Sequence, residues 1–239
     1  MKPVSASVGQ IIHGDCREVL PSIIREAETP IIVSDPPFNV GYHYDEYEDK
    51  MEETEYYDFM KEIFSAAPSV VIHYPEALYR LSAVMGQVPS RVVSWIYNSN
   101  TARQHRDIAY LGIDPVFDNL GEYKNPTDKR IAKRISEGKK ARAYDWIYSD
   151  QIKNVSSEKT SHPCQMPLDV MLLVVGSLPA DATIIDPFAG SGTTLLAAKR
   201  LGRRYIGVER SEKYWREAQT RLANDSPLFD SIPSGDSVL

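Results

Sequence analysis

Cysteine is scarce in this chain, and the sequence contains no long hydrophobic run. Its 239 residues include two cysteines, Cys16 and Cys164, without the spacing of a metal site. We therefore expect reduced thiols and no disulfide framework. No apolar run approaches membrane-spanning length, and the first five residues lack the apolar core of a signal peptide. These absences predict a cytoplasmic protein with no membrane contact.

The five histidines also lack a metal-binding pattern such as HxxxH, so we expect no metal site. The apolar and charged fractions, 42% and 25%, are ordinary for a globular protein. A chain of this length can form one α/β domain with a sizeable core, or such a domain carrying a small insertion.

The formal net charge is −6, which taken alone disfavours a nucleic-acid partner. The charges are unevenly distributed, however. Residues 124–142, here called the basic segment, contain eight basic side chains against Asp128 and Glu137, a net charge of +6, whereas residues 45–62 carry nine acidic side chains against two lysines, a net charge of −7. A basic segment in an acidic protein can contact phosphates while the remaining surface stays soluble. A solvated helix face is the alternative interpretation.

Strand-like and helix-like patterns alternate along most of the chain. Strands are expected at residues 7–13, 31–34, 69–73, 91–97, 182–185 and 204–208, and helices at 17–28, 54–67, 76–85, 168–178, around 195–201 and at 211–223. This alternation predicts an α/β fold with a doubly wound, mostly parallel sheet. Ligands of such sheets bind at the carboxyl ends of the strands.

Apolar periodicity is poor from residue 98 to 161, with only doubtful strands at 108–111 and 146–148. We therefore expect an inserted recognition region at 99–160, outside the main sheet, and a main domain formed by 1–98 and 161–223. The tail, 224–239, is rich in Pro, Ser, Asp and Gly and is expected to lack fixed structure. Trp95, Tyr97 and Trp146 are expected to be buried sheet aromatics.

Four carboxylates, those of Asp15, Asp35, Asp186 and Glu209, fall at or just past predicted strand ends. The apolar run before Asp35 ends in Pro36 and Pro37, which cannot donate to a sheet ladder. The strand tip therefore presents an acceptor carboxylate, backbone carbonyls and the ring of Phe38. It could hold a planar molecule by its edge and its face, although an ordinary proline turn would show the same pattern.

The segment Gly190-Ser191-Gly192 follows another predicted strand and precedes a helix, so its backbone can approach a ligand closely. Glu209 ends the next strand, where a carboxylate can accept from both hydroxyls of a ribose. Leu195 stands where a dinucleotide fingerprint has its third glycine, and no lysine of a Walker loop follows. An adenosine ligand without a pyrophosphate fits this pattern better.

These motifs resemble those of the amino-group DNA methyltransferases. Residues 186–194 with Glu209 resemble their S-adenosylmethionine motif, and residues 35–38 resemble their catalytic motif, whose Asp form is typical of adenine enzymes. The catalytic motif precedes the cofactor motif, as in the β group. Residues 14–16 resemble the segment placed against the cofactor adenine, and residues 161–167 resemble a His-Pro-x-Gln-Lys-Pro segment, with Met166 in place of the lysine. The resemblance covers residues 8–100 and 160–223.

The resemblance implies a Rossmann-like methyltransferase fold, S-adenosyl-L-methionine as cofactor, and methyl transfer to an exocyclic amine of DNA. It implies catalytic roles for Asp35, Pro36, Pro37 and Phe38. The implied cofactor-binding residues are Asp15, Cys16, Asp35, His162, Gln165, Asp186, Phe188, Ala189, Gly190, Ser191, Gly192, Thr193, Thr194 and Glu209.

Because the amine edge is paired inside a duplex, the target base must be flipped out. We expect adenine N6 as the target, with cytosine N4, a catalytically silent DNA-binding protein and a dinucleotide oxidoreductase as alternatives. The small recognition region favours a homodimer or a partner subunit. The expected DNA-contacting residues are Asn39, Tyr42, Tyr44, Arg103, Arg106, Lys124, Lys129, Arg130, Lys133, Arg134, Lys139, Lys140 and Arg142.

Overall fold

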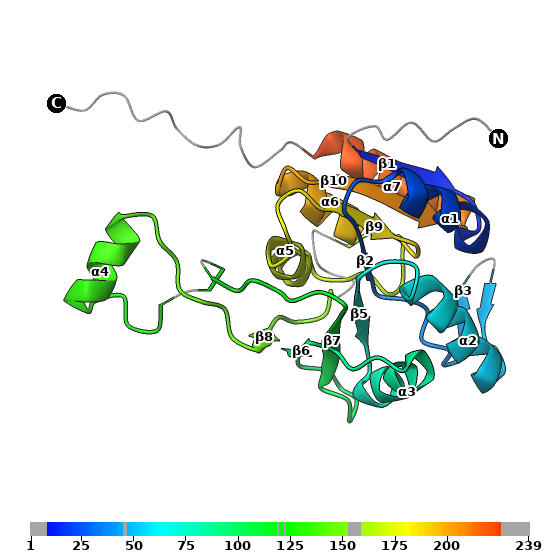
Figure 1. Ribbon diagram of the computed structural model, residues 1–239, viewed down its shortest axis with the longest axis horizontal. Helices are drawn as coiled ribbons and strands as arrows, with labels where there is room; N and C mark the ends of the chain where they lie inside the picture. Colours follow the sequence, from blue (N-terminus) through cyan, green and yellow to red (C-terminus); the bar gives the residue numbers. More distant parts are fainter. Residues whose placement is uncertain (1–8, 45–46, 119, 122, 153–158, 226–239) are drawn as a thin grey trace.

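The computed structural model describes residues 9–44, 47–118, 120–121, 123–152 and 159–225. Within these residues, one sheet of eight strands runs through the centre of the protein (Figure 1). Its order is β1-β10-β9-β2-β5-β7-β6-β8. The strands are β1 (Gly9–His13), β2 (Pro30–Ser34), β5 (Ser69–His73), β6 (Arg91–Ile96), β7 (His105–Leu111), β8 (Trp146–Tyr148), β9 (Thr183–Asp186) and β10 (Arg204–Glu209).

Neighbouring strands from β1 to β5 pair in parallel, whereas β7 pairs antiparallel with both β5 and β6. The expected mostly parallel α/β sheet is therefore confirmed. The expectation that residues 108–111 and 146–148 lie outside this sheet is wrong. β7 is an internal strand between β5 and β6, and β8 adds a parallel edge strand to β6. The sequence pattern of each segment indicated only a short strand. Pairing with other strands of the sheet supplies the hydrogen bonds that stabilise both.

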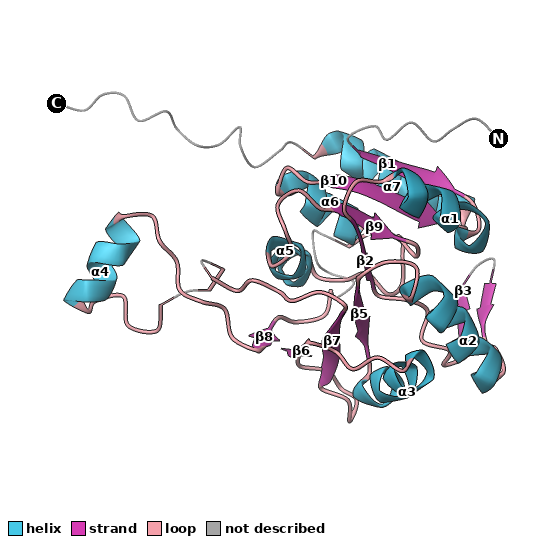
Figure 2. Ribbon diagram, viewed as in Figure 1, coloured by secondary structure: helices cyan, strands magenta, loops and turns pink. Residues whose placement is uncertain are grey.

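Helices cover both faces of the sheet (Figure 2). The first layer consists of α1 (Cys16–Glu26), α2 (Glu53–Phe64) and α3 (Pro75–Met85), and the second of α5 (Leu168–Gly176), α6 (Thr193–Arg200) and α7 (Glu212–Asn224). β2 shows how the sequence builds both: Ile32 packs into the first layer, while Ile31 and Val33 pack into the second. A strand buried on both faces explains the continuous apolar run before Asp35.

Residues 112–145, here called the arm, leave the sheet between β7 and β8 and carry α4 (Lys129–Ser136) (Figure 1). Asp128 caps α4 by accepting from the backbone N–H groups of Arg130 and Ile131. All of α4 is described, and none of its residues is buried. Of the three aromatics expected in the sheet core, Trp95 and Tyr97 are buried, but Trp146 is 49% exposed because β8 is an edge strand.

A short antiparallel hairpin, β3 (Tyr42–Tyr44) and β4 (Tyr47–Asp49), follows the Asp35 tip. None of the helices in the described ranges has the length and apolar character needed to cross a membrane. The expected tail, 224–239, falls outside the described residues beyond Asp225.

Candidate active site

One pocket opens at the carboxyl ends of the central strands, and several predicted site residues meet there. The Asp35 tip forms one wall, and the Gly190 loop with Glu209 forms another. The turn that carries Asp15 also lines this pocket. Segments separated by more than 150 residues in sequence thus share one cavity, as expected at the carboxyl edge of a parallel sheet.

The tip at residues 35–38 is held by side chains from two other elements. The hydroxyl of Tyr56, on α2, donates to the Pro37 carbonyl at 2.7 Å and lies 2.9 Å from Nε2 of His73, at the end of β5. The Tyr74 backbone N–H donates to His73 Nδ1, so Nε2 is the nitrogen that can carry the proton of a neutral ring. Burial lowers the pKa of His73 to about 3, which keeps that ring neutral.

Phe38 completes the tip, and its ring lies 4.5 Å from the ring of His73 and 5.1 Å from that of Tyr74. The sequence indicated neither Tyr56 nor His73 as part of the site. Tyr56 matched the apolar side of a helix and His73 ended a buried strand, so both patterns were those of ordinary core residues. Only the close approach of α2 and β5 gives them this role.

Asn39 turns the chain from the tip into the hairpin and has a left-handed φ of 56°, which asparagine tolerates better than most residues. Its side chain accepts from the Met51 N–H and donates to the Met51 carbonyl. Its amide is therefore engaged in holding the hairpin, where a DNA contact had been expected. Tyr42 and Tyr44 lie in β3, but their side chains are outside the described part of the structure.

Asp35 follows β2 directly, and its carboxylate lies 3.4 Å from Nη1 of Arg106 on β7. Burial raises the pKa of Asp35 to about 7; the Arg106 charge opposes this rise, and the nearby Asp186 carboxylate adds to it. Arg106, which the sequence analysis placed among the DNA-contacting residues, is buried, with 8% of its surface exposed. Arg103 remains at the surface, with its guanidinium 4.2 Å from the ring centre of Tyr74.

Glu209 ends β10 and lines the same pocket. Its Oε2 accepts from the Gly190 N–H at 2.7 Å, and its Oε1 accepts from the Ser211 N–H at 2.8 Å. These two bonds fix the carboxylate, and each oxygen retains a lone pair for a further donor. Burial raises the pKa of Glu209, and the two backbone bonds oppose that rise.

Asp15 caps α1 by accepting from the Arg17 N–H, and it also binds the Arg17 guanidinium. The Arg17 side chain lowers the pKa of Asp15 and so keeps its carboxylate charged. Cys16 begins α1 and lines the same pocket. Burial raises the pKa of the Cys16 thiol to about 12, so this cysteine is a neutral wall residue.

The comparisons with known proteins agree with these motifs. A family model described as DNA methylase, of the N6 and N4 type, matches residues 92–220, which is more than half of the chain. The chain belongs to this family of DNA methylases.

Curated relatives of this methylase include two type II methyltransferases. M.HinfI of Haemophilus influenzae is 27% identical over 261 aligned positions, covering 93% of this chain and 70% of the relative. M.ScaI of Streptomyces caespitosus is 38% identical over 108 aligned residues, covering 44% of this chain and 31% of the relative. This match therefore spans about a third of the length of M.ScaI.

Solved structures show the same fold. The complex of M1.HpyAVI with SAM superposes with a TM-score of 0.58 at 21% identity, over 90% of this chain and all of the other. The cytosine-N4-specific PvuII DNA methyltransferase superposes with a TM-score of 0.63 at 16% identity, over 92% of this chain and 89% of the other. Together with the sheet order, these likenesses establish the Rossmann-like methyltransferase fold.

Within this methylase, several residues expected to touch the cofactor do not line the pocket. Asp186 is 2% exposed; its Oδ1 accepts from the Ser34 hydroxyl at 2.5 Å and from the Phe188 N–H at 3.1 Å. Its carboxylate thus ties the ends of β2 and β9 together. The other residues of this group, which are also absent from the pocket wall, are Gln165, Ala189, Ser191, Gly192, Thr193 and Thr194.

The two glycines of the loop are needed for packing. Gly190 has a φ of 51°, and a Cβ there would lie 3.0 Å from Nε2 of His162, a pocket residue. Gly192 has a φ of 75°, and a Cβ there would meet that of Ala218 at 3.1 Å. The pattern expected to permit close approach of a ligand therefore also lets α7 and the His162 segment pack against the loop.

Proposed function

We propose that this methylase transfers a methyl group from S-adenosyl-L-methionine to the N6 amine of a flipped adenine in DNA. The observation that carries this proposal is that the Asp35 tip, Gly190 and Glu209 line the same pocket. Family membership fixes amino-group DNA methylation as the reaction class. The choice of adenine over cytosine is supported by the aspartate of the tip.

The residues of the pocket suit an adenosine with a positively charged methionine part. Glu209 is held by two backbone N–H groups and keeps lone pairs for two ribose hydroxyls. Phe188 and the Cys16 turn supply apolar walls for a purine, and the three carboxylates that line the pocket outnumber its two guanidinium groups, those of Arg17 and Arg210. When bound, S-adenosyl-L-methionine supplies an electrophilic methyl carbon.

The Asp35 tip supplies what the amine needs. An exocyclic amine is a weak nucleophile because its lone pair is delocalised into the ring. The Asp35 carboxylate and the Pro36 carbonyl can each accept one amine hydrogen, which favours a pyramidal nitrogen. A carboxyl with a pKa of about 7 is also suited to receive the proton that the methylated amine must lose. Preorganised acceptors of this kind account for much of the rate gain in enzymes.

Phe38 offers a stacking face for the flipped base, worth roughly 1–3 kcal/mol. Its ring is already fixed by His73 and Tyr74, so little freedom is lost when a base arrives. This contribution is of the same size as the few kcal/mol required to unstack and unpair the base.

The DNA duplex is expected to contact the arm and the neighbouring β8 edge. The eight basic residues of the basic segment lie on the arm, and Lys124 lies 4.6 Å from the ring centre of Tyr144. Tyr144 and Trp146 are exposed and stack at 6.0 Å with an interplanar angle of 14°. Lysines beside exposed aromatic faces can meet phosphates and bases together.

The decisive experiment is nucleoside mass spectrometry of duplex DNA incubated with the protein and S-adenosyl-L-methionine. We expect N6-methyladenine to accumulate with the wild-type chain and not with Asp35→Ala. If N4-methylcytosine alone appears, the proposed target base is wrong, while the assignment to amino-group methylation stands. If neither product forms although DNA and cofactor bind, the protein is a catalytically silent binder.

A further inference from the structure

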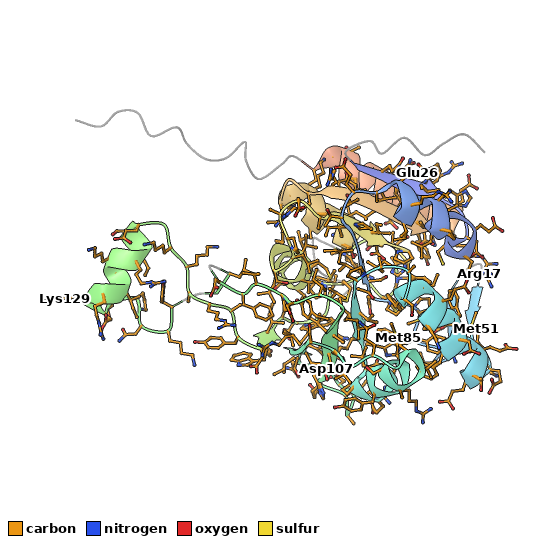
Figure 3. All side chains as sticks on the ribbon, viewed as in Figure 1. Arg17, Glu26, Met51, Met85, Asp107 and Lys129 are labelled. Atoms are coloured by element: carbon orange, nitrogen blue, oxygen red, sulfur yellow. The ribbon has the colours of Figure 1, made fainter. Side chains whose placement is uncertain are left out.

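Arg106 lies near the start of β7, among aromatic rings (the next residue in the chain, Asp107, is labelled in Figure 3). Its guanidinium carbon is 4.5 Å from the ring centre of Phe38, 5.3 Å from that of Trp95 and 5.7 Å from that of Tyr74. Its Nη1 lies 3.4 Å from Asp35 Oδ2. Because β7 runs antiparallel to its neighbours, a residue near the start of β7 lies at the edge where β2 ends.

We propose that Arg106 is a positioning residue for methyl transfer, which binds one oxygen of Asp35, keeps that carboxylate ionised and fixes the ring of Phe38. This inference rests on the proposed function of the Asp35 tip. Arg106 does not line the pocket, so it acts through Asp35 and Phe38 and does not touch the substrate.

The two oxygens of Asp35 have different surroundings. Oδ2 faces Arg106, whereas Oδ1 is buried and has no hydrogen-bond partner among the described residues. A buried acceptor without a partner is costly and is usually found where a ligand completes the bond. The ion pair therefore determines which oxygen is left for the target amine.

Arg106 also determines the charge of Asp35. The charged groups that influence this carboxylate are Arg106 from β7, which lowers its pKa, and Asp186 from β9, which raises it. Burial and Asp186 both favour the protonated form of Asp35. In that form one carboxyl oxygen carries the proton and is no longer an acceptor for the amine. Arg106 is the cation that opposes both effects, and it also lies over the face of Phe38, which joins the two working parts of the tip.

The neighbouring side chain of Met166 allows this charge to be moved experimentally. Its sulfur lies 3.7 Å from Nη1 of Arg106, and the residue is 6% exposed. A lysine at position 166 extends one atom beyond the methionine chain, so its ammonium can reach the space that the guanidinium fills. Met166→Lys can thus supply a cation from the segment that precedes α5 when position 106 on β7 no longer carries one.

The first test compares Arg106→Gln and Arg106→Lys with the wild type, measuring kcat and KM for a DNA duplex between pH 5.5 and 9. We expect Arg106→Gln to lower kcat roughly 100-fold, the scale on which a preorganised group at the reacting centre acts. Its activity midpoint should move to higher pH because the cation that lowers the pKa of Asp35 is lost, whereas Arg106→Lys should keep the wild-type midpoint. Affinity for S-adenosyl-L-methionine, measured by calorimetry, should change less than threefold in both.

The second test uses Arg106→Met with Met166→Lys, and Arg106→Met with Met166→Leu as the matched control. The lysine pair should recover at least tenfold in kcat over the control and return the pH midpoint towards that of the wild type. Thermal unfolding verifies that both chains fold. Both pairs place an apolar side chain at position 106, so they still test the inference if Arg106→Gln does not fold.

Two results would overturn the inference: an unchanged pH midpoint in folded Arg106→Gln, or equal activity of the lysine and leucine pairs. Either result leaves the proposed function intact, provided that the wild-type chain methylates DNA. If the wild-type chain shows no methyl transfer while it binds cofactor and DNA, the proposed function itself has failed.

Discussion

The catalytic edge of the sheet and the arm are built in opposite ways. At the edge, three working groups are held by other elements of the fold: Asp35 by β7, the Pro37 carbonyl by α2, and Glu209 in part by the Gly190 loop. On the arm, the ion pairs are local, such as Lys139 with Glu137. Transfer chemistry needs groups fixed in direction, whereas phosphate attraction needs only charge within reach.

The largest effect is expected at the edge, from Asp35→Ala. Loss of the acceptor should lower methyl transfer by roughly 100-fold to 1000-fold, as for other preorganised electrostatic groups. Transfer of a radiolabelled methyl group to DNA measures this. The matched control is Asp58→Ala, an exposed carboxylate on α2. Unchanged transfer in the Asp35 variant would place catalysis elsewhere.

Glu209→Ala should weaken S-adenosyl-L-methionine binding by roughly 10-fold to 100-fold, because hydrogen bonds to a charged group contribute about 1.5–3 kcal/mol. Calorimetry with the purified chain measures the affinity. The exposed Glu26→Ala serves as control. If the Glu209 variant binds the cofactor as tightly as the wild type, its ribose role is excluded.

The pH dependence of the edge follows from the raised pKa of Asp35, about 7. The carboxylate must be ionised to accept from the amine, so kcat should rise with pH and level off above the midpoint. Below the midpoint, kcat should fall about tenfold for each pH unit. A rate profile from pH 5.5 to 9 with one DNA substrate shows the midpoint, and a flat profile would contradict the role given to ionised Asp35.

The arm should give the smallest effect per residue. Lys133→Gln removes an exposed charge, so DNA affinity should fall only a few-fold, with a salt slope lower by about 0.9 if one phosphate contact is lost. Unfolding free energy should change by less than about 0.5 kcal/mol. Fluorescence anisotropy with labelled duplex at several salt concentrations measures this, with Lys61→Gln as control. Equal slopes for both variants would remove Lys133 from the DNA interface.

The same contrast explains what the sequence predicted. The strand at 69–73 has the expected bounds, and the helix expected at 211–223 is found at Glu212–Asn224, because apolar periodicity is a local signal. α4 was not among the predicted helices, because half of its residues are charged and only Ile131, Ala132 and Ile135 are apolar. β7 was assigned outside the sheet because apolar periodicity is poor from residue 98 onwards, although it pairs with the preceding strand, β6, and with β5.

The sequence by itself determined the chemistry offered at each strand end: a carboxylate and ring at Asp35 to Phe38, a glycine loop at Gly190, and a carboxylate at Glu209. These depend on short motifs whose prolines and glycines constrain the backbone locally. Only the tertiary structure decided that Arg106 pairs with Asp35 and that Tyr56 and His73 hold the tip. Such pairings depend on strand order and direction, which arise from the packing of the whole sheet and not from any one segment.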